Sequence, residues 1–549
     1  MKLSRFANLS VCLFVSSILT ADALVAGDED PAGETGKNLS VVAITALKAQ
    51  IAIQQQQIDQ LRQTLETQQK LLDRAVATPQ FPKLGEVAGR TPVVPLGSSS
   101  SASPAALQKP GAEGTSNVSP LSFGIGAAKF TPFGFVDLTQ VIRSTNAGGG
   151  IGTTFSGIPL NNTVQGKLSE SRFSLQNSRV GLRVDSQSKG TDITGYLETD
   201  FLGNAPTNLT VTSNAATLRL RLFWAQFKRD KWELLAGQSW SMLTPGRKGI
   251  SPIPGDLFYS QDVDTNYQNG LTWARQPTLR FVYHPTKEVS WGLGVEASDQ
   301  YVGGAVTFPA ALGVAYPAEF NNGTAGTATP NLTPDFVSKL AFDTTVGGKA
   351  MHAEIGGLLR TFRAYNPLTD QHFTHIGGGG EVGLNLEVAK GFRLIGNGYV
   401  SDGGGRYIFG SGPDLIAKLN GDISLVHAAS TVDGFEYSYK PKDNPSAKES
   451  LFFAYYGGAY FRKNFGFDPV SKAFFGYGFP NGSLAANRSI NQFTVGVHQT
   501  FWKSANYGDV RLLTQYSYLS RDPWSVPATN PQRNASVNML FLNLRYDLP

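Results

Sequence analysis

The chain has 549 residues, of which 16% are charged and 11% aromatic, with 60 glycines and a formal net charge of +5. A soluble domain usually carries about 25% charged residues, and so small a net charge gives no reason to expect nucleic acid as a partner. The single cysteine, Cys12, falls in the leader segment described next, so disulfides, thiol catalysis and cysteine metal sites are excluded from the mature chain.

Residues 1–23 have the pattern of a cleavable signal peptide. Lys2 and Arg5 form a basic start, residues 11–19 are largely apolar, and Ala21-Asp22-Ala23 is a small-x-small cleavage site. No later segment has 18 consecutive apolar residues, which a membrane-spanning helix needs. We therefore expect an exported protein whose membrane-spanning part, if it has one, is built from β-strands.

Residues 38–77 carry a heptad repeat that predicts an α-helical coiled coil. The seam positions, which we expect to hold three chains together, are Ile44, Leu47, Ile51, Ile58, Leu61, Leu65 and Leu72. Gln54 and Gln68 fill the remaining positions of the second seam, where buried glutamines fix register and oligomer number. The pattern predicts a periplasmic trimeric coiled coil, and a single amphipathic helix lying on a surface is the alternative.

Residues 78–122 are rich in Pro, Ser, Gly and Ala and predict a flexible linker. Residues 123–549 hold all seven tryptophans and all nineteen tyrosines, and their short stretches alternate between apolar and polar residues. In 218–222, for example, the leucines are expected on one face of a strand and the arginines on the other. Aromatic residues recur beside the short turns, as in an interfacial girdle, among them Phe227, Trp232, Phe501 and Trp502.

The connections between these stretches alternate between short and long. Seven are short and eight are long, including a third long loop at 242–266 and a fifth at 363–375. Short periplasmic turns and long external loops are typical of outer-membrane barrels. The sequence thus predicts an all-β transmembrane barrel of about 16 antiparallel strands, with both ends on the periplasmic side and the coiled coil in the periplasm.

Several motifs in the barrel region resemble the DcaP-like family of outer-membrane porins. They are Thr131-Pro132-Phe133-Gly134-Phe135-Val136-Asp137, Ser178-Arg179-Val180-Gly181-Leu182-Arg183, Tyr196-Leu197-Glu198-Thr199-Asp200-Phe201, Leu218-Arg219-Leu220-Arg221, Ala236-Gly237-Gln238-Ser239-Trp240-Ser241 and the segment from His352 to Arg360. The resemblance covers most of 123–549. It implies a homotrimer of 16-stranded barrels that prefers small anionic solutes such as dicarboxylates.

The candidate pore-lining residues follow from strand parity. If the leucine-rich face meets lipid, the inward-facing set comprises Arg179, Arg183, Arg219, Arg221, Arg280 and Arg360. Arginine on the lipid face would cost about 2–4 kcal/mol at mid-membrane. The arginines of the early strands are expected to cluster on one wall and attract anions. In the alternative interpretation they pair with Glu198, Asp200 and other carboxylates and stiffen the wall.

The third long loop is the candidate constriction, because such a loop commonly folds inward in a porin. Its charged residues are Arg247, Lys248, Asp262 and Asp264. We expect no metal and no cofactor, since the six histidines lack ligand spacing, and Asp262 with Asp264 is only a weak calcium candidate.

The predicted function is an outer-membrane porin for small hydrophilic solutes that favours anions and is not an enzyme. One alternative is a carbohydrate-selective porin, to which Tyr196, Phe223 and Tyr399 would contribute aromatic faces. Another is an envelope tether whose coiled coil contacts the cell wall. A barrel enzyme would need a nucleophile beside a base, which the pattern does not offer.

Overall fold

The computed structural model describes Gln55 and residues 119–147, 150–203, 217–253, 258–262, 267–312, 320, 331, 333–366, 368–439, 449–526 and 534–549. The chain divides into two units, Met1–Ser99 and Ser100–Pro549, and every described residue except Gln55 belongs to the second. The predicted signal peptide, the coiled-coil seam and residues 78–118 lie outside the described residues. No helix among the described residues is long and apolar enough to span a bilayer.

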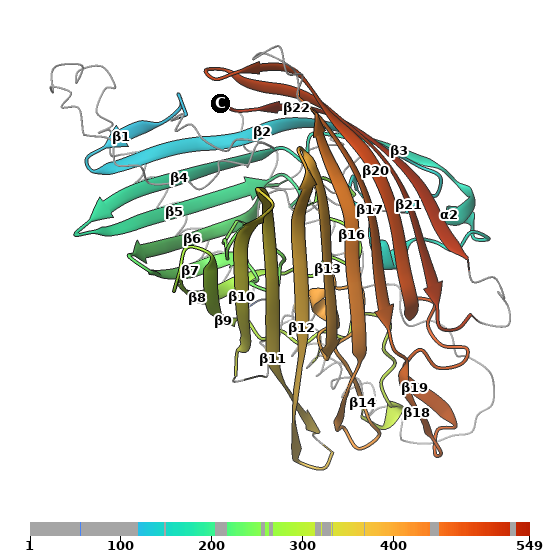
Figure 1. Ribbon diagram of the computed structural model, residues 1–549. Helices are drawn as coiled ribbons and strands as arrows, with labels where there is room; N and C mark the ends of the chain where they lie inside the picture. Colours follow the sequence, from blue (N-terminus) through green and yellow to red (C-terminus); the bar gives the residue numbers. More distant parts are fainter. Residues whose placement is uncertain are drawn as a thin grey trace, which may run out of the picture. The chain divides into compact units, whose positions relative to one another are not determined.

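Most of the described residues belong to one large antiparallel sheet that closes on itself (Figure 1). Its strands are β2 (Ala128–Arg143), β3 (Glu170–Ser174) with β4 (Arg179–Ser188), β5 (Thr191–Asp200), β6 (Arg219–Arg229), β7 (Trp232–Trp240), β8 (Arg275–Tyr283), β9 (Val289–Glu296), β10 (Asp335–Val346), β11 (Lys349–Asn366), β12 (Gln371–Ala389), β13 (Phe392–Asp402), β16 (His427–Tyr439), β17 (Ser450–Phe461), β20 (Asn487–Ser504), β21 (Gly508–Pro523) and β22 (Ala535–Asp547). Each pairs with the next, and β22 pairs with β2 to close the barrel.

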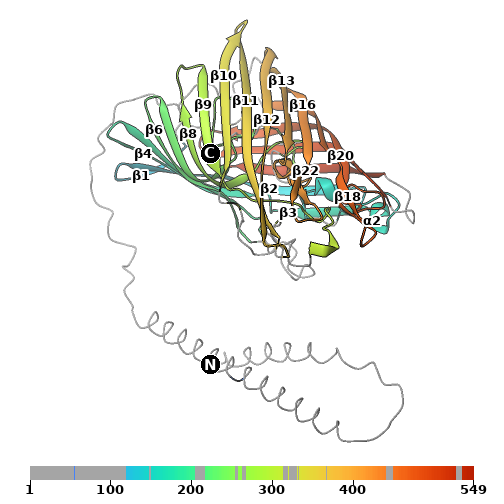
Figure 2. The same cartoon turned by 90° about the horizontal axis from the view of Figure 1, so that it is seen from below.

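The barrel has 16 strands, as predicted. Segments β3 and β4 both pair with β2 and together make one strand, and β1 (Phe123–Ile125) is only a short hairpin partner of β2. Closure leaves no sheet edge, so the backbone groups of every strand can be hydrogen-bonded within the barrel wall. Figure 2 shows the same strands from below.

The short turns are tight because their residues adopt left-handed backbone conformations. Lys189 and Gly190 have φ of 49° and 77°, and Gly347 and Gly348 have φ of 57° and 74°. Positive φ at both central residues is the feature of the type I′ hairpin, whose twist matches that of the strands it joins. Glycine adopts this conformation without strain, which explains its frequency between paired strands.

The long connections carry short elements of their own. These are η1 (Phe155–Gly157), α2 (Val164–Lys167), η2 (Ala310–Leu312), η4 (Gly405–Tyr407), β14 (Leu415–Ala417), β15 (Ile423–Leu425), β18 (Asn464–Asp468) and β19 (Ala473–Tyr477). In Figure 1, β14, β18 and β19 gather at one end of the strands. The long fifth loop predicted at 363–375 is wrong, because β11 continues to Asn366 and β12 begins at Gln371.

The outer and inner faces of the wall differ as the alternation predicts. Leu359 is 52% exposed on the outer face, whereas the next residue, Arg360, is 0% exposed inside. One departure occurs in β6, where Glu198 pairs with Leu222 and Thr199 with Leu220, so that Arg221 is the extra residue of a β-bulge. The bulge shifts the parity, and Leu222 is therefore buried inside, although the sequence predicts it on the outer face with Leu220.

Candidate functional site in the barrel lumen

The described residues of the third long loop, 241–253, 258–262 and 267–274 between β7 and β8, lie inside the barrel and reach the opposite wall. The Gly246 amide donates to Glu354 on β11 at 2.9 Å, and the Gln261 amide donates to Gln515 on β21 at 2.7 Å. The Asn269 amide donates to the side chain of Gln492 on β20 at 2.8 Å. Anchors on strands so far apart around the barrel mean that this loop narrows the lumen.

The predicted constriction residues have different environments. Arg247 forms a bidentate ion pair with Glu436 on β16, with N–O distances of 2.6 and 2.8 Å, and lies over the ring of Tyr259. Lys248 is exposed, and Asp262 is fully buried. Asp264 lies outside the described residues.

Asp262 ties the third loop to the first loop and to the far wall. Its carboxylate accepts a 2.6 Å hydrogen bond from the Gln492 amide, and its carbonyl accepts one from the Thr153 amide at 2.7 Å. Burial raises the pKa of Asp262 to about 7, although hydrogen bonds from Ser517 and Gln492 oppose this shift. The protonation state of this carboxyl thus changes near neutral pH.

A second anchor of the loop is a buried charge network that the sequence analysis missed. The Lys339 ammonium on β10 donates to the Thr244 carbonyl at 3.0 Å and lies 3.2 Å from Glu354 and 2.6 Å from Glu381. His352 contacts Glu354 on the same strand, at 3.1 Å. The alternation of Val337, Lys339 and Ala341 would have placed the lysine inward, but nothing in sequence pairs it with β12.

Three of the predicted arginines form one cluster with two carboxylates. Arg221 contacts Glu198 at 2.6 Å and Asp200 at 2.8 Å. Arg219 donates to Asp200 from Nε at 3.0 Å and from Nη2 at 2.6 Å, and Arg179 lies 3.6 Å from Glu198. These contacts join β4, β5 and β6 on the inner face, and they are the carboxylate pairing that the alternative interpretation described.

The other predicted arginines lie apart from this cluster. Arg183 pairs with Asp185 on its own strand at 2.6 Å. Arg280 is buried under the third loop and donates to the Ile250 carbonyl at 3.0 Å. Because each belongs to a separate group of contacts, the inward arginines do not form a single continuous cluster.

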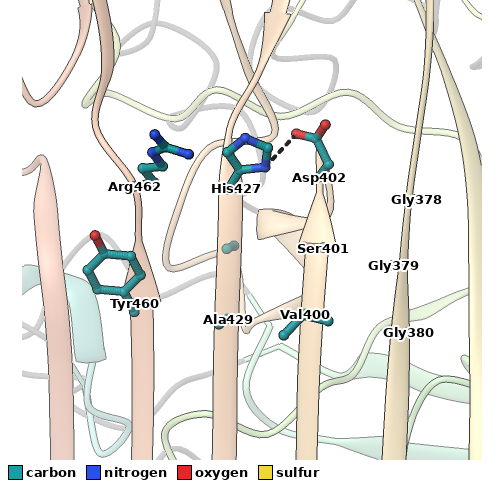
Figure 3. Close-up of a pocket in the computed structure, with 11 residues that line it drawn as sticks. Gly378, Gly379, Gly380, Val400, Ser401, Asp402, His427, Ala429, Tyr460 and Arg462 are labelled. Carbon is teal, nitrogen blue, oxygen red and sulfur yellow. Dashed lines mark ion pairs between the residues drawn. The ribbon is translucent and has the colours of Figure 1, made fainter.

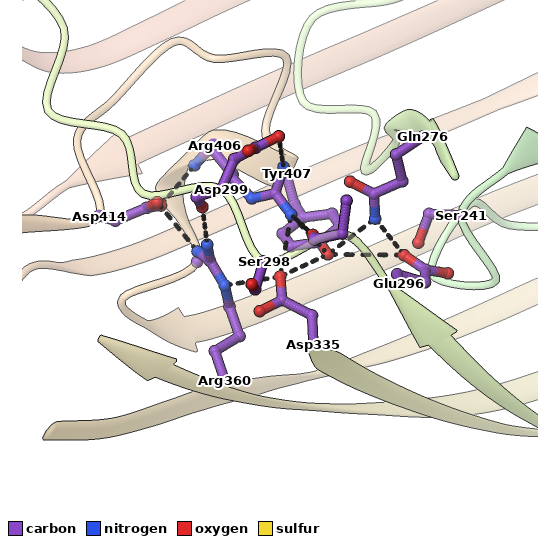
Figure 4. Close-up of polar contacts among 12 residues, drawn as sticks. Ser241, Gln276, Glu296, Ser298, Asp299, Asp335, Arg360, Arg406, Tyr407 and Asp414 are labelled. Carbon is purple, nitrogen blue, oxygen red and sulfur yellow. Dashed lines mark hydrogen bonds and ion pairs between the residues drawn. The ribbon is translucent and has the colours of Figure 1, made fainter. Parts of the chain in front are cut away.

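Arg360 belongs to a network that joins three loops to the wall (Figure 4). Its guanidinium lies 2.9 Å from Asp335 on β10 and 3.0 Å from Asp414 in the sixth loop. Arg406, in η4, also contacts Asp335 at 2.9 Å, and the Tyr407 hydroxyl donates to the same carboxylate at 2.9 Å. Sequence reasoning missed Arg406, Tyr407 and Asp414 because they come from an external loop.

In two of these ion pairs the arginine is clearly more exposed than its carboxylate partner. Arg219 is 33% exposed while Asp200 is 1% exposed, and Arg406 is 12% exposed while Asp335 is fully buried. Two pairs show the reverse: Arg183 is 13% exposed and Asp185 is 35% exposed, and Arg406 is 12% exposed while its second partner, Asp299, is 52% exposed. In the first two pairs, water and solutes reach the guanidinium before the carboxylate.

Aromatic rings form a second feature of the interior. Phe133, Tyr196 and Trp224 stack in a row across β2, β5 and β6, with ring centroids 4.9 and 5.1 Å apart. Trp240, Tyr267, Trp273 and Phe409 form a further group at 4.6–5.7 Å. Of the residues proposed for a sugar path, Tyr196 lies in the first stack and Tyr399 is buried, but Phe223 is 60% exposed on the outer face beyond the β6 bulge.

No group of three or more histidine, aspartate or glutamate side chains suited to holding a metal ion occurs in the described ranges. The candidate site consists of a loop held across the lumen, arginines paired with carboxylates, and stacked aromatic rings. Such an arrangement can bind and orient a passing solute.

Comparison with known proteins shows that the fold of this chain is similar to that of solved outer-membrane channels. No protein-family model and no curated protein matches the sequence. The crystal structure of the outer membrane channel DcaP of Acinetobacter baumannii superposes with a TM-score of 0.53 at 16% identity, covering 77% of this chain and 97% of that chain. An anion-selective porin from Comamonas acidovorans (TM-score 0.40, 11% identity, 76% and 99% covered) and trimeric OmpT of Vibrio cholerae (0.38, 11%, 77% and 100%) are more distant.

Only the first of these three structures superposes with a TM-score above 0.5. At 16% identity the likeness concerns the fold. The closed barrel of 16 antiparallel strands is therefore the fold of an outer-membrane porin similar to DcaP, and the resemblance drawn from the sequence motifs is confirmed at that level.

Proposed function

We propose that this protein forms a water-filled channel in the bacterial outer membrane for small hydrophilic solutes, acts without catalysis, and favours anions such as dicarboxylates. The observation that carries the proposal is a closed barrel with an apolar outer face, a charged inner face and a loop held across its lumen. An apolar outside and a polar inside are what lipid and water require of a channel wall.

The anion preference is supported by the exposure of Arg219, whose carboxylate partner Asp200 is almost fully buried. A guanidinium donates two parallel hydrogen bonds to a carboxylate, which makes it a better partner than a point charge for a dicarboxylate. Arg280 adds a buried positive charge whose hydrogen bond goes to a carbonyl. We therefore expect an electropositive path beside the third loop.

The test is the reversal potential of the full-length protein in a planar bilayer across a KCl gradient, followed by addition of succinate. We expect an anion-biased potential and block by succinate, and Arg219→Gln should weaken both. Arg229→Gln, an exposed arginine beside a short turn, is the matched control and should change neither. A potential that favours cations would contradict the proposal.

A carbohydrate path is the second candidate, because the stacked rings of Phe133, Tyr196 and Trp224 line the inner face. Aromatic faces bind the apolar sides of sugar rings. Current block by maltodextrin without anion bias would favour this function. Trp224→Ala should remove sugar block and leave block by succinate unchanged if both solutes use separate contacts.

We also propose that the protein is a homotrimer whose residues 38–77 form a periplasmic coiled coil. The heptad seam from Ile44 to Leu72 supports this assembly. Light scattering of the detergent-solubilised protein should give three chains, and deletion of 38–77 tests whether the coiled coil holds them. Envelope instability after that deletion, with conductance unchanged, would support the additional role as a tether to the cell wall.

A further inference from the structure

A groove opens on the outer face of the barrel, across β12, β13, β16 and β17 (Figure 3). Its volume is about 580 Å³, and its lining includes Gly378, Gly380, Val400, Ala429, Tyr460 and Arg462. It lies on the opposite side of the wall from the loop and the arginines of the lumen, so it has no part in the proposed conduction path.

The groove exists because small residues fall on one line across the strands. In the register of the sheet, Gly380 pairs with Val400, Val400 with Ala429, and Ala429 with Tyr460. Elsewhere the outer face carries leucine and phenylalanine, which fill the space above the backbone. The base of the groove is therefore apolar and shallow, with the Tyr460 ring as one side wall.

The loop end of the groove is polar. His427 and Asp402 face each other at 3.2 Å and are both about half exposed. Arg462 is exposed immediately after β17, and Figure 3 shows it beside His427 at the same end as Asp402. Lys463 follows, with its ammonium 5.6 Å from the Trp524 ring. The two cations at this end, Arg462 and Lys463, therefore outnumber its one carboxylate, Asp402.

We propose that this groove binds an anionic membrane lipid, with its phosphate headgroup at Arg462 and His427 and an acyl chain over Gly380 and Val400. Arginine recognises phosphate oxygens through charge-assisted hydrogen bonds, and a groove floored by glycine admits a chain close to the backbone. The loop end of the strands is the level at which headgroups lie if the barrel spans a bilayer. Asp402 lies 3.2 Å from the His427 ring at this end.

Two substitutions test the two ends of the groove separately. Arg462→Gln removes the headgroup cation. Gly380→Leu fills the base, and the wall should tolerate it, because a Cβ at Gly380 meets only the Gly356 carbonyl at an ordinary 3.6 Å. Gly378 is unsuitable, since a Cβ there would lie 2.3 Å from the Leu358 carbonyl. Arg229→Gln, at the short-turn end of the barrel, is the control.

The measurement is native mass spectrometry of the full-length protein in detergent, titrated with dioleoyl phosphatidylglycerol or dioleoyl phosphatidylcholine. We expect preferential binding of the phosphatidylglycerol, weakened about tenfold by Arg462→Gln, the typical cost of one charge-assisted hydrogen bond. Gly380→Leu should weaken binding of both lipids, and Arg229→Gln should change neither.

Three results would overturn the proposal. Equal binding of the two lipids would show that the groove does not recognise the charge. Full competition by inorganic phosphate would show a site for a free anion. A change in the number of chains per complex in Gly380→Leu, without a change in lipid binding, would assign the groove to a contact between copies. Lipid binding needs membrane insertion but not conduction, so this test is independent of the channel function.

Discussion

The inner and outer faces of the same strands follow opposite rules. On β11, Leu359 faces outward with half of its surface exposed, and Arg360 faces inward, fully buried between Asp335 and Asp414. The outer face is specified one residue at a time, because each side chain needs only to be apolar. The inner face is specified in groups, because a buried charge is stable only with its partners present. Substitutions on the two faces should therefore fail for different reasons.

The largest effect is expected from Arg360→Leu. The substitution leaves Asp335 and Asp414 without the guanidinium that lies between them, and removing one partner of a buried ion pair costs about 3–5 kcal/mol. We expect a matching loss in the free energy of unfolding, measured by urea titration of the detergent-solubilised barrel with tryptophan fluorescence. Arg360→Lys, which keeps the charge, should lose less.

If Arg360→Leu unfolds at the same urea concentration as the unchanged protein, the network in Figure 4 does not stabilise the barrel. In that case the contacts of Arg406 and Tyr407 with Asp335 are sufficient to hold the sixth loop to the wall. The buried charges of the inner face would then not depend on one another for stability.

The next effect is on the outer face. Ile355 lies near the middle of β11 and is 56% exposed, so Ile355→Arg should place a charge in the centre of the lipid and cost about 2–4 kcal/mol. Tyr365→Arg, on the same face and one residue before the end of the strand, should cost about 1 kcal/mol or less. Refolding yields into lipid vesicles measure both. Equal costs at the two positions would argue against a membrane on this face.

The alternation of apolar and polar residues predicted which side chains lie on the outer face and how many strands there are. Both features depend only on single residues and their neighbours in sequence. It failed at Leu222, where one extra residue in β6 reverses the parity, and at the fifth loop, where two strands extend beyond their apolar stretches. The ion pairs of the inner face could not be predicted from the sequence for another reason. Arg247 and Glu436 are 189 positions apart, and no local pattern pairs them.

Asp433 is an exception on the outer face, since it is an exposed carboxylate in the middle of β16. It accepts a 2.7 Å hydrogen bond from the Thr431 hydroxyl. If lipid covers this face, Asp433→Val should stabilise the barrel by less than about 2 kcal/mol, because acidic residues cost less than arginine there. Urea unfolding in vesicles measures the change. Destabilisation would instead indicate a protein partner at this position.

The smallest effect is expected from Asp262, a residue of the third loop that contacts the inner face of the wall at Gln492. Burial raises the pKa of Asp262 from 3.8 to about 7. The folded protein therefore holds a proton that the unfolded chain releases at a lower pH. This contribution to stability is complete below about pH 3.8 and is lost as the pH rises through 7. Above pH 7 the buried carboxylate ionises, and its loss of hydration should favour a conformation in which the third loop opens and water reaches Asp262.

Hydrogen exchange of residues 258–262, corrected for intrinsic rates, should accordingly be faster at pH 8.5 than at pH 5.5. Asp262→Asn keeps an oxygen that accepts from Gln492 but cannot ionise, so it should abolish the pH difference at a cost of about 1 kcal/mol or less. Arg143 and Ser517 face the same carboxyl and stay unchanged in this variant. A pH difference that persists in Asp262→Asn would mean that another group, rather than Asp262, controls how firmly the loop is held across the lumen.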